Sequence, residues 1–126
     1  MAITTILDYP IAERTTAELT ARLYDEVGNA IDVLLLTTLT LTLYVKDDPT
    51  TIINSRNGQN VLNINDVVVD SNGNLTWIMA PADNAIIDDN DESEVHVALF
   101  EWTWSAGAKA GRHEIEITVQ NMENVL

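Results

Sequence analysis

The sequence contains no cysteine, and only six of its 126 residues are lysine or arginine. The absence of cysteine excludes disulfide bonds, thiolate zinc sites and cysteine nucleophiles. Because cations are scarce, the 20 aspartates and glutamates leave a formal net charge of −14. Such a surface repels phosphate groups, so we expect neither nucleic acid nor an anionic membrane surface as a direct partner.

Long apolar runs are missing as well. No window reaches the roughly 18 apolar residues of a membrane-spanning helix. Residues 1–7 lack the basic region and long apolar run of a signal peptide, so we expect synthesis and folding in a cytoplasm. The chain length fits one domain, which should bury roughly two-thirds of the surface of its unfolded chain.

The strongest local pattern lies at residues 37–46. Leu39, Leu41 and Leu43 alternate with threonines there. A period of two predicts a β-strand whose leucines face a core, and the β-branched threonines also favour a strand. Similar patterns place three later residues in the same core: Trp77, Ile115 and Ile117.

Weaker alternation and β-rich composition predict further short strands along the chain. These lie near residues 15–24, 51–54, 61–70, 75–79, 95–104 and 113–120. The first also fits helical spacing, but the turn-forming residues 25–29 after it favour a strand. About seven short antiparallel strands, with turns every ~8–12 residues, predict an all-β fold.

This pattern indicates a single β-sandwich. We expect the sandwich to span residues 15–120, with one helical turn at 81–87. Residues 1–14 should form an N-terminal arm or edge strand, and residues 121–126 a short C-terminal tail.

The acidic run at residues 88–94 is the best candidate for a metal site. It lacks the glycine of an EF-hand loop and the helices on either side of it, whereas calcium requires about six to eight oxygen ligands. The run therefore predicts a solvated loop, and we expect no metal and no cofactor.

The two histidines could act as a pair only if the last hairpin brought them together. A hairpin that closes across residues 105–111 should place His113 opposite about Thr103, and His96 opposite about Gln120. The imidazoles are then far apart along the sheet. No serine lies in a Gly-x-Ser-x-Gly nucleophile elbow either, so we predict no catalytic residues and no enzymatic activity.

The three tryptophans allow two interpretations. Trp77, Trp102 and Trp104 could line a platform that binds sugars, and the last two share one strand face. Large aromatic side chains of small sandwiches are usually part of the core. We therefore favour core packing.

Four segments resemble a known family. They are Leu23–Asp32, Tyr44–Asp47, Asp70–Trp77 and Ala80–Ala85. In their order and turn chemistry they resemble the Ig-like β-sandwich modules of tailed bacteriophages, such as the N-terminal module of the baseplate upper protein family. The similarity covers roughly Thr15 to Val119.

The resemblance implies a non-enzymatic virion protein, exposed on the exterior of the particle and made in the host cytoplasm. Baseplate upper proteins continue into a shaft, and this sequence stops at Leu126. We therefore expect a capsid decoration or cement protein first, and a tail, neck or baseplate adaptor second. A carbohydrate-binding module is a more distant alternative. Expected partners are phage capsid or tail proteins, with homo-oligomers only within the particle.

Apolar residues near both ends are the candidate contacts with such partners, because chain ends usually fray in a free monomer. They are Ile3, Ile6, Leu7, Met122, Val125 and Leu126.

Overall fold

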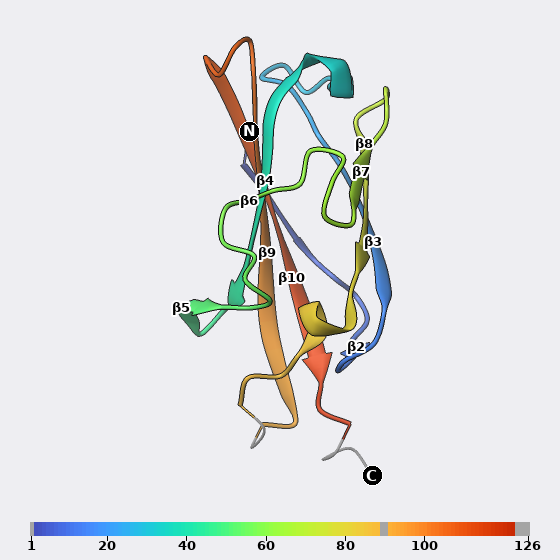
Figure 1. Cartoon of the computed structure of the whole chain (residues 1–126), viewed down its shortest axis with the longest axis vertical. Coiled ribbons are helices and arrows are strands. Elements are labelled where there is room, and N and C mark those ends of the chain that lie inside the picture. Colours follow the sequence, from blue (N-terminus) through green and yellow to red (C-terminus); the bar gives the residue numbers. More distant parts are fainter. Residues whose placement is uncertain (1, 89–90, 123–126) are drawn as a thin grey trace.

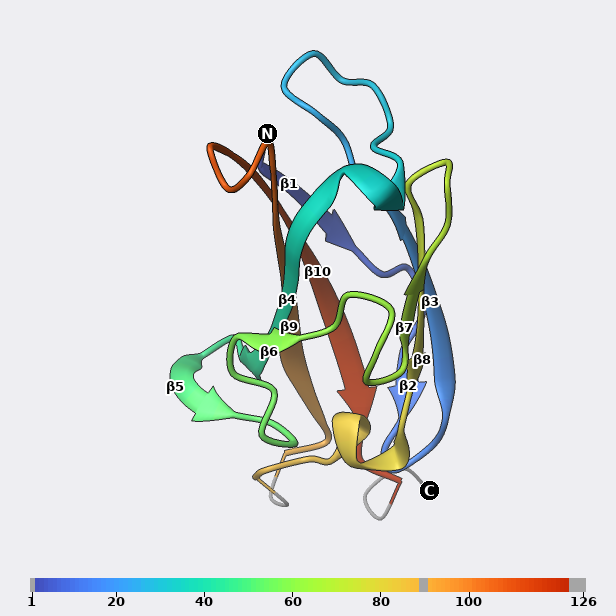
Figure 2. The ribbon, with the colours of Figure 1, turned by 45° about the horizontal axis from the view of Figure 1, so that its top comes forward.

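Two β-sheets pack face to face in the computed structural model (Figures 1 and 2), which describes residues 2–88 and 91–122, with side chains from residue 5 onward. The large sheet has seven strands. They are β1 (Ala2–Ile6), β2 (Ile11–Ala12), β4 (Leu36–Val45), β5 (Asp48–Ile52), β6 (Gln59–Asn60), β9 (Ser93–Trp104) and β10 (Lys109–Gln120). Their order is β1-β10-β9-β4-β5, with β2 beside β10 and β6 beside β4.

The small sheet has three strands in the order β3-β8-β7. They are β3 (Ala17–Arg22), β7 (Val67–Val69) and β8 (Asn74–Met79). Two short 3-10 helices, η1 (Val33–Leu35) and η2 (Pro81–Asn84), lie at opposite ends of the sandwich (Figure 2). No helix in the described part of the chain has the length and hydrophobicity needed to cross a membrane.

The strand order matches an immunoglobulin sandwich. Strands β3, β8 and β7 occupy the places of B, E and D, and β10, β9, β4 and β5 occupy those of G, F, C and C′. The expected all-β Ig-like sandwich is therefore confirmed. Not all strands are antiparallel, however, because β1 and β2 both run parallel to β10.

The core lies where the inner faces of the two sheets meet. Leu39, Leu41 and Leu43 are fully buried on β4, and they face Trp77 on β8. Ile115 and Ile117 are buried on β10. The alternation therefore identified the core face of each of these strands correctly. Strand β9 lies between β4 and β10 and pairs with both, which explains its apolar residues on both faces.

The expected register of the last hairpin is wrong by three residues. Trp104 pairs with Lys109, so His113 lies opposite Phe100 and His96 lies opposite Ile117. The turn needs only residues 105–108, because Ser105, Ala106 and Gly107 adopt positive φ angles that reverse the chain quickly.

The N-terminal residues form an edge strand rather than a free arm. Residues 2–6 pair with residues 112–116 of β10, and Leu7 continues this pairing by donating its main-chain N–H to the Glu116 carbonyl at 2.9 Å. After the Pro10 turn, β2 pairs further along the same strand. The turn at residues 25–29 does form, with a bridge between Tyr24 and Ala30, but it links strands of different sheets.

Candidate functional site

Arg56 and Asp83 form a buried ion pair. The guanidinium donates from Nε to Oδ1 at 2.6 Å and from Nη2 to Oδ2 at 3.0 Å. Its other N–H groups reach Gln59 Oε1 at 2.8 Å, the Asn65 carbonyl at 3.1 Å and Asp66 Oδ2 at 3.0 Å. All five donors of the guanidinium are therefore used. The arrangement ties the loop after β5 to η2, and it leaves no donor for a ligand.

Glu94 and His96 form a second buried pair on β9. Glu94 Oε1 accepts a hydrogen bond from His96 Nε2 at 2.6 Å, and the carboxylate also accepts the main-chain N–H groups of Ile87 and Asp88 at 3.1 Å each. Burial lowers the pKa of His96, although the hydrogen bond to Glu94 opposes this shift. The pair holds the loop after η2 against β9, while His96 Nδ1 is buried without a hydrogen-bond partner in the described structure.

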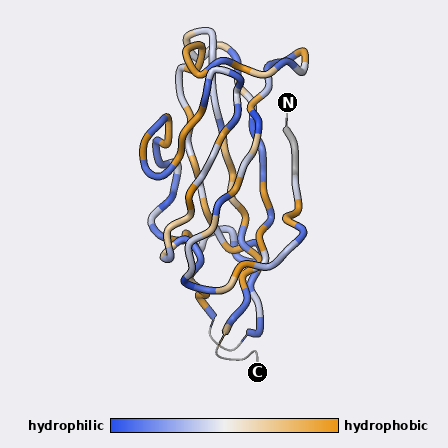
Figure 3. The backbone as a smooth tube through the Cα atoms, turned by 90° about the vertical axis from the view of Figure 1, so that its right-hand side faces the viewer, coloured by the Kyte–Doolittle hydropathy of each residue, from blue (hydrophilic) through white to orange (hydrophobic). Residues whose placement is uncertain are grey.

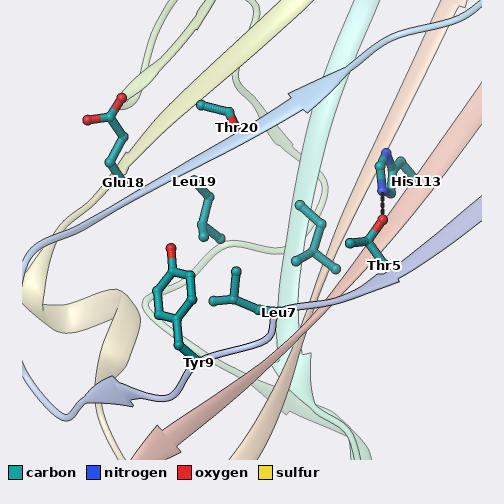
Figure 4. Close-up of a pocket in the computed structure, with 8 residues that line it drawn as sticks. Thr5, Leu7, Tyr9, Glu18, Leu19, Thr20 and His113 are labelled. Carbon is teal, nitrogen blue, oxygen red and sulfur yellow. Dashed lines mark hydrogen bonds between the residues drawn. The ribbon is translucent and has the colours of Figure 1, made fainter.

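A small cavity of about 130 Å³ opens between β1 and β3. Figure 4 shows Leu7 and Tyr9 on one side of the cavity, and His113 hydrogen-bonded to Thr5 on the other. His113 Nε2 lies 2.8 Å from Thr5 Oγ1, and burial lowers the pKa of the imidazole.

A hydroxyl beside an imidazole can serve as a nucleophile and its base, but the base then needs a third group to orient it. His113 Nδ1 is buried without a hydrogen-bond partner in the described structure. The second imidazole cannot assist, because His96 lies four register positions away along β9, about 13 Å. The two histidines are not brought together, as the sequence predicted.

A larger cavity, of about 330 Å³, lies between the β4–β5 turn, the loop after η2 and the start of β9, and it has an acidic lining. Its carboxylates belong to Asp47, Asp48, Asp88, Asp91 and Glu94. Asp48 accepts the hydroxyls of Thr50 and Thr51 at 2.7 and 2.6 Å, and Glu94 is held by His96. Among residues 2–88 and 91–122, no group of three or more histidine or carboxylate side chains is placed to hold a metal ion.

The tryptophans lie in the core. Trp77 and Trp102 are fully buried, and Trp104 is nearly so. Trp77 packs edge-on against Phe100 at 5.7 Å between ring centroids, and the Trp102 indole N–H donates to the Tyr24 carbonyl at 3.2 Å. None of the three rings offers a face for stacking on a sugar.

The expected terminal contacts occupy different environments. Ile6 and Met122 are exposed, and Leu7 is partly buried against the core. Ile3 belongs to β1, but its side chain lies outside the described part of the structure, as do residues Val125 and Leu126 entirely.

Two apolar side chains that are more exposed than Ile6, which is 67% exposed, lie in the connection between β3 and β4. Leu34 is 86% exposed, Val27 72% and Leu35 65%. We call Leu34 and Leu35, which are adjacent in η1, the apolar tip, whereas Val27 lies on the separate turn at residues 25–29. Sequence reasoning missed the tip, although one signal was present: residues 33–36 are four consecutive apolar residues, which one strand face cannot bury together.

Comparisons with known proteins give no family for this chain: no family model, curated protein or solved structure matches it.

Proposed function

We propose that this chain is a non-enzymatic structural protein of a tailed-phage particle, and that it decorates the outside of a preassembled capsid. The observation that carries the proposal is that the two buried polar pairs, Arg56–Asp83 and Glu94–His96, serve to hold loops in place. Glu94 lines the acidic cavity, but its carboxylate is bonded to His96 and to the main-chain N–H groups of Ile87 and Asp88. Function is therefore assigned to the outer surface of the domain.

The segments that resemble phage modules support the particle context. Residues 23–32 form the connection after β3, and residues 44–47 form the end of β4 and the turn into β5. Residues 70–77 form the turn before β8 and the first four residues of that strand, and residues 80–85 contain η2. All four segments include a connection between strands of the sandwich, and such connections are where domains of this kind commonly bind partners.

The charge distribution supports addition to a preformed shell. Three of the cations are engaged in exposed ion pairs: Lys46 with Glu116, Arg112 with Glu101 and Lys109 with Glu26. Arg56 is buried and is already bonded to Asp83 and Asp66. With six lysines and arginines against 20 aspartates and glutamates, most carboxylates have no cation to offset their charge. Free copies should repel one another within a Debye length of about 8–10 Å and remain monomeric until a lattice binds them.

A tail, neck or baseplate adaptor is the second candidate. The observation that favours it is the resemblance to the N-terminal module of baseplate upper proteins. The hypothesis of a carbohydrate-binding module rested on exposed tryptophans, and Trp102 and Trp104 are buried.

Cryo-electron microscopy of the virion, together with copy number from mass spectrometry, tests the proposal. We expect density on the capsid lattice, nearly as many copies as capsid subunits, and particles that form without the protein but lose DNA at a lower temperature. Density confined to the neck or baseplate would support the adaptor instead. A virion that contains no copy would contradict both.

A further inference from the structure

We propose that the protein docks through its apolar tip, and that the partner surface is an apolar socket with a basic rim. This inference rests on the proposed function, since the socket would belong to the capsid shell. The tip consists of Leu34 and Leu35, which lie in the connection between β3 and β4.

The exposure of two consecutive leucines follows from the geometry of η1. In a 3-10 helix, residues three positions apart share a face. Val33 packs against the core and Leu36 is buried, so this face points inward. Leu34 and Leu35 must then point outward. Polar residues would fit these two positions equally well, so the fold gives no reason for leucine there. Figure 3 shows the hydrophobic colour of this coil at the top of the molecule.

Several hydrogen bonds and one ion pair hold the connection at its N-terminal side. Asp25 Oδ1 accepts the main-chain N–H groups of Val27 at 3.0 Å and Asn29 at 2.9 Å. Glu26 Oε2 lies 2.6 Å from Lys109 Nζ, which ties the loop to β10. The indole N–H of Trp102 on β9 donates to the Tyr24 carbonyl at the start of the connection.

It is held equally well at its C-terminal side. Ile31 donates to the Leu23 carbonyl at 3.0 Å, and Gly73 approaches so closely that a Cβ would lie 2.8 Å from the Ile31 oxygen. Asp32 Oδ1 accepts the Leu34 N–H at 3.0 Å and caps η1. A tip that is already ordered loses little conformational entropy on binding, so its apolar area contributes more fully to affinity.

Charge defines the chemistry of the partner. Asp25, Glu26 and Asp32 accompany the tip, whereas Lys109 is the one cation tied to this connection in the described structure. With a net charge of −14 behind them, these carboxylates favour a basic rim. The same charge disfavours a second copy of this chain as the occupant.

The experiment measures co-sedimentation of the purified protein with particles of the encoding phage that were assembled without it. The test variant is L34S/L35S. The matched control is V68T/I78T, which removes two exposed apolar side chains from the outer face of the small sheet. Both variants change exposed positions, so thermal unfolding should stay close to that of the wild type. If L34S/L35S melts early, Leu34→Ser replaces it, because Leu34 is the more exposed of the two leucines.

We expect L34S/L35S to bind about tenfold more weakly or worse, as for a central apolar contact, and V68T/I78T to bind like the wild type. Raising the salt from about 0.05 M to about 0.5 M should slow association, and faster association would contradict the basic rim. Equal binding by the test variant and the wild type would overturn the apolar tip alone. A wild type that binds no particle would overturn the proposed function and this inference with it. A dimer in free solution that L34S/L35S dissociates would reassign the tip to self-association.

Discussion

Replacing Arg56 by methionine should destabilise the protein more than any change at its surface. The guanidinium stacks over the Trp77 ring at 5.6 Å and makes five hydrogen bonds. Without it, the fully buried Asp83 carboxylate keeps only the Asn54 amide at 2.9 Å and the Ala80 main-chain N–H at 2.8 Å. Breaking a buried ion pair by removing one partner costs about 3–5 kcal/mol.

Urea unfolding at neutral pH measures this cost from the midpoint and slope, and Tm should fall by on the order of 10 °C. Arg56→Lys is a useful intermediate, because it keeps the charge and loses the planar fork that binds both Asp83 oxygens. The double variant R56M/D83L removes both charges. It should be more stable than the sum of the single changes predicts, since no uncompensated charge stays buried.

A loss below about 1 kcal/mol for Arg56→Met would refute this reasoning. It would mean that water reaches Asp83 or that the loop after β5 detaches from η2 without much cost.

Three further predictions concern the core, the histidines and metal. Leu41→Ala should cost about 2–5 kcal/mol in urea unfolding and Thr40→Ala little, so equal small effects would contradict the face assignment. Burial lowers the pKa of His96 and of His113, so each neutral imidazole contributes its full stability above about pH 6.5, and this contribution is lost as the pH falls through the folded-state pKa. NMR titration should give pKa values below about 6.5 for both histidines, and higher values would refute the effect. EDTA should leave Tm unchanged, whereas a calcium-dependent rise would show that residues 88–94 bind metal.

Local patterns predicted the strands because the signal and its cause lie in the same few residues. The alternation at Leu39, Leu41 and Leu43 identifies both the strand and its buried face, since successive side chains of a strand point in opposite directions. The turn at residues 70–74 was predictable for a similar reason. Asp70 accepts the main-chain N–H groups of Asn72 and Asn74, which is a contact within five residues.

The register of the last hairpin was not predictable to the residue, because it depends on how tightly the turn closes. Positive φ angles at Ser105 and Ala106, which are not glycine, shortened the turn and moved His113 opposite Phe100. The apolar tip was missed for another reason. Residues 33–36 read as an apolar run, and only the orientation of η1 decides which of them are buried.

By itself, the sequence determined the class of fold, the inward faces of its main strands, the lack of thiol chemistry and the acidity of the surface. These properties depend on composition and on neighbours along the chain. Tertiary structure alone decided that Arg56 meets Asp83 across 27 residues, and that β1 runs parallel to β10. It also decided that Leu34 and Leu35 remain in solvent. Such contacts depend on how distant segments pack together, and short-range periodicity carries no record of that packing.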